Sequence, residues 1–119
     1  MSIEYIGERI FLQEVEAAGY VWVARCLHKS IYSLTLGGSG CSLPIWSSRE
    51  RVAEFLKNAR LVGPKFEPYA VPLDVFVTAW LSDKSMAISE VLVNSDGKST
   101  RMLVLSAEEF SAAQPAKQR

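Results

Sequence analysis

The sequence predicts a single α+β domain, in which a mostly antiparallel β-sheet of about five strands is covered on one face by helices. Two pairs of apolar segments joined by short turns are typical of β-hairpins. Between these pairs, the stretch from Ser47 to Leu81 shows the apolar spacing of helices. Hairpins combined with amphipathic helices favour this fold class. We expect the domain to span residues 1–113 and residues 114–119 to form a flexible C-terminal tail.

The N-terminal segment predicts an amphipathic helix. Apolar residues recur at helical spacing from Ile3 to Ala18, with acidic residues between them. Gly19 follows as a natural left-handed stop. The acidic pair Glu14 and Glu16 falls on the polar side, so we expect both carboxylates to be solvated surface charge.

A first hairpin is predicted directly after this helix. Residues 20–26 are rich in β-branched and aromatic types, and residues 31–36 alternate between apolar and polar side chains. The connection over residues 27–30 is short enough to join them as a hairpin. Residues 37–40, Gly-Gly-Ser-Gly, then predict a flexible loop.

The centre of the chain predicts a strand followed by a capped helix. Residues 42–46 form a short apolar strand. Ser47 with Glu50 three residues later fits a capping box, in which each side chain bonds the other residue's backbone N–H. We expect the helix to end within residues 58–60.

A proline-rich connector and a second helix follow. Residues 61–71 contain Pro64 and Pro68, so we expect this segment to stay extended. Pro72 suits the first turn of a helix. The apolar residues of this helix follow the spacing i, i+3, i+4, i+7 and i+8 in full: Leu73, Phe76, Val77, Trp80 and Leu81.

The C-terminal third predicts a second hairpin and a short helix. Residues 86–93 are almost continuously apolar, which indicates a central strand. The Asp-Gly turn within residues 94–98 leads to a partner strand over residues 100–105. Ser106 and Glu109 suggest another capping box.

Composition narrows the class of protein. The chain carries 13 basic and 13 acidic residues, and this zero net charge argues against non-specific binding of nucleic acid. The N-terminus lacks the pattern of a secretory signal, and no run reaches the ~18 apolar residues of a membrane span. We therefore expect a cytoplasmic protein in which Cys26 and Cys41 are reduced.

Motifs that resemble catalytic or binding signatures are better explained structurally. The Gly37–Gly40 loop precedes a strand and lacks the GK[ST] ending of a phosphate loop. His28 is the only histidine; a Cys41–His28 nucleophilic pair is sterically conceivable, but no Asn or Asp is placed to orient the histidine. Ser47 and Ser48 lack the flanking glycines of a nucleophile elbow. The sequence thus predicts no catalytic residue, no cofactor and no metal site.

Three residues are candidate contacts for a partner: Trp46, Arg49 and Arg101. Trp46 ends a strand just before a helix, where partial exposure would make it a binding anchor. A core role for Trp46 is the favoured alternative. We expect binding to use a sheet edge or the helix-free face of the sheet, with Arg49 and Arg101 as the other two candidate contacts.

Several of these segments resemble an uncharacterised bacterial family, DUF2750. The similarity covers roughly residues 15–110 and implies the same fold, but no active-site residue, because the family has no assigned activity. The chain departs from the family pattern at the Gly37–Gly40 loop and the connector over residues 61–71. The matching motifs are Trp22, Leu43-Pro44-Ile45-Trp46-Ser47-Ser48, the series Pro72, Leu73, Phe76, Trp80 and Leu81, and Val91-Leu92-Val93-Asn94.

From these observations we expect a non-enzymatic, cytoplasmic protein-binding module. Small domains of this size resemble immunity proteins, so we expect such a module to act either as an immunity protein or as an accessory factor. The alternative is a small-ligand-binding protein or an enzyme with a pocket between sheet and helices. A homodimer formed through an exposed strand is a further expectation, whereas nucleic acid and membranes are not expected as partners.

Overall fold

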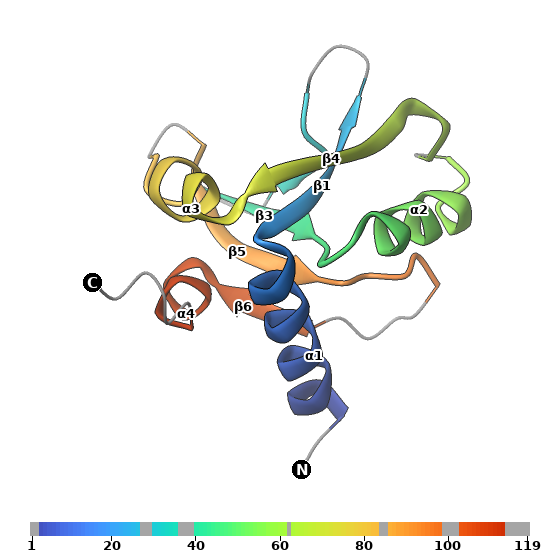
Figure 1. Cartoon of the computed structure of the whole chain (residues 1–119). Coiled ribbons are helices and arrows are strands. Elements are labelled where there is room, and N and C mark those ends of the chain that lie inside the picture. The colour runs from blue at the N-terminus through green and yellow to red at the C-terminus, as the bar shows by residue number, and fades with distance from the viewer. Residues whose placement is uncertain are drawn as a thin grey trace.

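Helices and strands alternate irregularly along the chain, which confirms an α+β fold (Figure 1). None of the helices in the described ranges combines the length and apolar character that crossing a bilayer requires. The predictions for His28, for the loop at residues 37–39, for Arg101 and for the tail at residues 114–119 lie outside the described residues. The computed structural model describes residues 3–26, 30–35, 40–61, 63–83, 86–98 and 103–113.

The chain begins with helix α1 (Ile3–Ala18), as predicted. Gly19 ends it with a φ of +79°, the left-handed conformation that glycine adopts at little cost. The chain then enters strand β1 (Tyr20–Cys26) without a loop. Because the Gly19 carbonyl accepts a 2.9 Å hydrogen bond from the N–H of Leu73, the end of α1 is joined to the second half of the chain.

The partner of β1 differs from the prediction. β1 pairs antiparallel with β4 (Phe66–Pro72), a strand inside the segment expected to be an extended connector. The expected hairpin is reduced to a bridge between Arg25 and Ile31, after which β2 (Leu34–Thr35) turns away to another strand. Prolines are compatible with β4 because it is an edge strand, which does not need every backbone N–H for pairing.

A second sheet has the strand order β2-β3-β5-β6. β3 (Cys41–Ile45) runs parallel to β5 (Ile88–Val93), and β5 pairs antiparallel with β6 (Leu103–Ser106). Three of the four strand pairs in the described residues are antiparallel, as predicted, and the parallel β3–β5 pair makes this sheet mixed. The reason is the long helical crossover between β3 and β5, which returns the chain to the end where β3 began.

The two sheets meet at a pair of tryptophans. The N–H of Trp22 bonds the carbonyl of Trp46 at 2.9 Å, and the reciprocal bond is 2.8 Å. This bridge places β1 beside the end of β3. The strands therefore form one curved surface rather than two independent layers (Figure 1).

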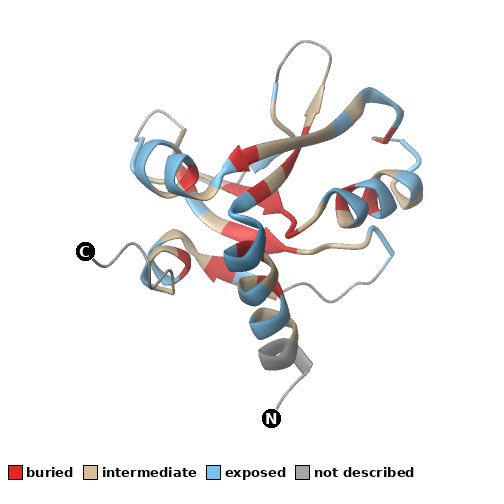
Figure 2. Cartoon of the chain, in the orientation of Figure 1, coloured by how far each residue is buried: buried red, intermediate tan, exposed pale blue. Residues whose placement is uncertain are grey.

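Helices pack on both faces of this surface, not on one as predicted, because alternate residues of β1 belong to two separate cores. Figure 2 shows buried residues in red along the strands. On one face, Phe11 of α1, Val21 and Val23 of β1 and Phe110 of helix α4 (Ala107–Ala112) belong to the main core. On the other face, helix α2 (Arg49–Asn58) covers β1 and β4. This second core contains Ala24, Trp46, Val52 and Phe55.

The predicted helix after Pro72 exists but is irregular. It consists of the short α3 (Leu73–Val75), which follows the 3₁₀ turn η1 (Gly63–Lys65) and β4, and then the π-helical turn η2 (Phe76–Trp80). Phe76 is completely buried, whereas the other predicted core residues are partly buried against the main core. Farther along, Ser106 and Glu109 form the predicted capping box at the start of α4.

Candidate functional site

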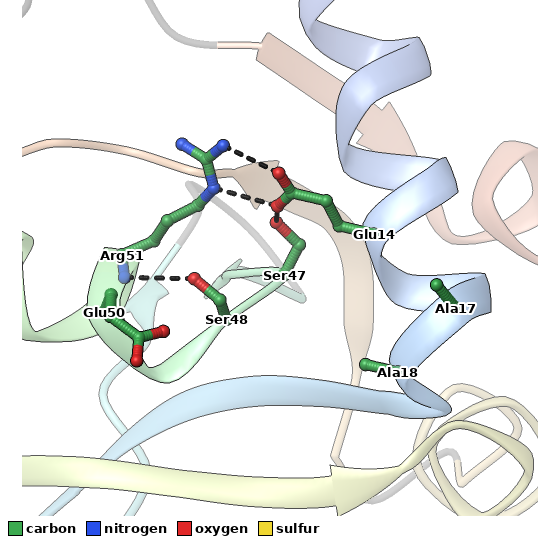
Figure 3. A pocket seen from close by; sticks show the side chains of 7 residues that line it. All are labelled: Glu14, Ala17, Ala18, Ser47, Ser48, Glu50 and Arg51. Atoms are coloured by element: carbon green, nitrogen blue, oxygen red, sulfur yellow. Dashed lines mark hydrogen bonds and ion pairs between the residues drawn. The ribbon is translucent and has the colours of Figure 1, made fainter.

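An open depression lies between the end of α1 and the start of α2 (Figure 3). Its volume is about 560 Å³. α1 contributes one wall, and the turn from β3 into α2 contributes the other (Figure 3). The lining residues are Glu14, Ala17, Ala18, Ser47, Ser48, Glu50 and Arg51.

An ion pair joins the two walls. The Nε of Arg51 donates to Oε1 of Glu14 at 3.0 Å, and an Nη donates to Oε2 at 2.9 Å. A guanidinium that engages both carboxylate oxygens makes a strong, oriented contact. The acidic residue expected to be solvated charge therefore connects α1 to α2.

Ser47 and Asn94 extend this contact to the turn after β5. The Ser47 hydroxyl donates to Oε1 of Glu14, and Nδ2 of Asn94 donates to that hydroxyl at 3.1 Å. The Oδ1 of Asn94 in turn accepts from the backbone N–H of Ser47 at 2.9 Å. We call Glu14, Ser47, Arg51 and Asn94 the Glu14 network. It holds three segments that are distant in the sequence.

The helix cap lies one residue later than predicted. Ser48, not Ser47, is the N-cap of α2, and its hydroxyl accepts a 3.3 Å bond from the N–H of Arg51. Ser47 is 2% exposed and uses its hydroxyl in the Glu14 network instead. The first serine of the pair therefore serves tertiary contacts and the second starts the helix.

Interactions within the Glu14 network favour the charged forms of Glu14 and Arg51. Hydrogen bonds from Arg51 and then Ser47 lower the pKa of Glu14 below its ordinary value. The pKa of Arg51 is raised, mainly by its bond to Glu14. A carboxylate with a lowered pKa is a poor general base, and the Ser47 hydroxyl is buried. The arrangement thus favours fixed charge over proton transfer.

We expect Glu14→Gln to lower the free energy of unfolding at neutral pH by about 1 kcal/mol, because both side chains of the ion pair are partly exposed. The Arg51 and Glu14 side chains are 41% and 37% exposed. The lowered pKa means that the carboxylate stabilises the fold above the ordinary carboxyl pKa of ~4.3. This contribution disappears as the pH falls through the folded-state pKa of Glu14.

Urea unfolding of the wild type and Glu14→Gln between neutral and acidic pH measures this contribution. The difference between the two proteins is expected to shrink on acidification. Glu16→Gln, an exposed carboxylate on the same helix, is the control and should track the wild type. If the difference in the free energy of unfolding between the two proteins stays constant at pH values well below the ordinary pKa of a carboxyl group, the ion-pair explanation is contradicted.

The candidate contacts predicted from the sequence do not gather at one place. Trp46 is completely buried, so it cannot act as a surface anchor in this structure. Its indole N–H donates to the carbonyl of Ser95 at 2.7 Å. Arg49 is exposed in the first turn of α2 and is not one of the residues that line the depression, although its chain neighbours Ser48 and Glu50 are. Arg101 lies outside the described residues.

No disulfide joins Cys26 and Cys41 in the structure. Burial raises the pKa of Cys41, which disfavours the reactive thiolate, and its Sγ lies 3.5 Å from the carbonyl oxygen of Met86. Its conceivable partner His28 is not among the described residues. In the described part of the chain, no group of three or more His, Cys, Asp or Glu side chains is arranged to hold a metal ion.

Comparison with known proteins adds no family assignment. No model of a known protein family matches the chain, and a search of curated proteins finds no similar sequence. The resemblance to DUF2750 therefore stays a prediction.

Proposed function

We propose that this protein is a non-enzymatic binding module that holds a partner protein at the depression between α1 and α2. The observation that carries this proposal is the combination of small apolar side chains with the paired charges of Glu14 and Arg51. Ala17 and Ala18 are exposed on one wall, while Arg51 and Glu14 bond each other. A partner's side chain can cover the alanines while Glu14 and Arg51 stay bonded to each other, so neither of these two charges is buried without a partner.

The exposed side chain of Arg49 also supports the proposal of a partner contact at this surface. It is exposed in the first turn of α2, next to Ser48 and Glu50 of the depression. Arginine is enriched at protein interfaces because its guanidinium both stacks and donates several hydrogen bonds. An immunity protein or an accessory factor in the cytoplasm would use such a surface, and we retain these two roles as proposals.

The packing of the main core does not favour the alternative of a ligand pocket between sheet and helices. The rings of Phe11 and Phe110 lie 6.0 Å apart, and those of Phe76 and Phe110 lie 5.4 Å apart. All three side chains are completely buried. They occupy the space between the strands and helices α1 and α4.

A photo-crosslinking amino acid at Ala17 tests the proposal in cells of the source organism. We expect a discrete adduct with one partner protein, because Ala17 lines the proposed contact surface. The same amino acid at Ala53, an exposed alanine of α2 that does not line the depression, is the control. Absence of an adduct at Ala17, or the same adduct at both positions, would contradict the proposal.

A further inference from the structure

The depression between α1 and α2 carries one carboxylate that is not yet paired. Glu50 lines the depression and is exposed in the first turn of α2. Among the residues that the structure describes, its side chain makes no hydrogen bond or ion pair, and no dashed line in Figure 3 reaches it. Because Glu14 and Arg51 are the other charged lining residues, the lining has one negative charge in excess.

The two arginines nearest to Glu50 in the sequence do not neutralise it. The guanidinium of Arg51 is bonded to Glu14, at 3.0 Å through Nε and at 2.9 Å through an Nη. Arg49 precedes Glu50 in α2, and consecutive residues of a helix do not face each other. The N-terminus of a helix also favours a negative charge nearby. Glu50 is therefore an ionised group that a partner can bind.

The surface beside this carboxylate is apolar. Ala17 and Ala18 are exposed on the α1 wall, and the open volume of about 560 Å³ has room for a whole side chain. A side chain that fills this space covers the methyl groups and also removes water from Glu50. Burial of a carboxylate without a counter-charge costs several kcal/mol, so an apolar or acidic side chain is a poor occupant.

We propose that the partner inserts a basic side chain, lysine or arginine, into the depression. Its aliphatic stem would lie along Ala17 and Ala18, and its cationic head would pair with Glu50. Lysine and arginine combine these two features, because a long apolar stem carries the charge at its end. This inference rests on the proposed function and adds the chemistry of the partner, with Glu50 as the residue that selects it.

Titrations followed by NMR, with small probes at low salt, test the preference for a cation. Nα-acetyl-lysine methylamide should shift the backbone amide signals of Ala17, Ala18 and Glu50. Nα-acetyl-norleucine methylamide, which has the stem without the charge, and Nα-acetyl-glutamate methylamide should bind more weakly. Glu50→Gln should weaken binding of the lysine probe by about two- to fivefold, the range for an exposed ion pair.

Two further variants separate recognition from a general effect of charge. Glu16→Gln removes an exposed carboxylate of α1 that does not line the depression, so it should bind the lysine probe like the wild type. Glu50→Lys should reverse the preference and bind the glutamate probe better than the lysine probe. A merely structural role of Glu50 at the start of α2 would not produce this reversal.

The inference is overturned if the lysine and norleucine probes bind equally well, or if neither shifts these amides. Equal affinity of the wild type and Glu50→Gln for the lysine probe would also overturn it. These results would leave the proposed function standing, because cross-linking at Ala17 does not require a cation. Conversely, absence of an adduct at Ala17 contradicts the proposed function, whereas the titrations still decide whether the depression selects a basic side chain.

Discussion

Trp46→Ala is expected to lower the free energy of unfolding by about 3–5 kcal/mol, the range for removing a large buried aromatic side chain. Trp46 is completely buried, and its ring lies 5.0 Å from that of Phe55 of α2. Its backbone joins β1 to β3 through Trp22, and its indole N–H bonds Ser95. One residue thus contacts elements from three parts of the chain through its backbone and its side chain. Urea denaturation followed by circular dichroism measures the loss.

Trp46→Phe separates the two contributions of this residue. Phenylalanine retains most of the ring packing but leaves the Ser95 carbonyl without its donor, so we expect a smaller loss of about 1–3 kcal/mol. A loss below about 1 kcal/mol for Trp46→Ala would contradict the burial of Trp46. It would also reopen the surface role that the sequence suggested for this residue.

Gly63→Ala is expected to destabilise the protein by about 2–3 kcal/mol through overpacking. A Cβ added at Gly63 would lie 1.9 Å from the carbonyl oxygen of Leu56 and 2.8 Å from its carbonyl carbon. Those atoms are backbone of α2, so relief requires η1 to move away from the helix. Gly63 is also bound there by a 2.7 Å hydrogen bond from its N–H to the carbonyl of Ala59.

Gly7→Ala provides the matched control for that substitution. A Cβ at Gly7 meets nothing within 4 Å, and the residue lies inside α1. Alanine in a helix interior is favoured over glycine by about 0.5–1 kcal/mol, so this variant should be slightly more stable than the wild type. Thermal and urea unfolding of both variants check the pair. Equal stabilities of Gly63→Ala and the wild type would contradict the close approach of η1 to α2.

Local signals in the sequence were sufficient to predict most of the helices and strands. The end of α1 at Gly19 and the capping box of Ser106 and Glu109 depend on neighbouring residues alone, and both are confirmed. The β5–β6 hairpin is likewise confirmed in its antiparallel pairing.

Strand pairing across long distances was not predictable in the same way. β4 was mistaken for a connector because its prolines are common in loops, and only its position at an edge makes them acceptable. The parallel pairing of β3 with β5 depends on the path of the whole crossover between them. No local sequence pattern predicts the path of that crossover.

The candidate site could be predicted only in part. Arg49 is exposed in the first turn of α2, and its chain neighbours Ser48 and Glu50 line the depression, whereas Arg49 itself does not. Glu14 and Asn94 were not recognised, because their partners Arg51 and Ser47 are far away in the sequence. The serine pair was a usable signal, since only one of two adjacent serines can cap α2, and the other was free for a tertiary contact.

Calorimetric titration of the purified partner that cross-links at Ala17 tests the proposed binding surface most directly. Ala17→Gln places a larger side chain in the depression, and we expect it to raise the dissociation constant at least about tenfold. Ala53→Gln makes the same change outside the depression and should leave the dissociation constant within about twofold of the wild type. Equal affinities of wild type and Ala17→Gln would contradict the account.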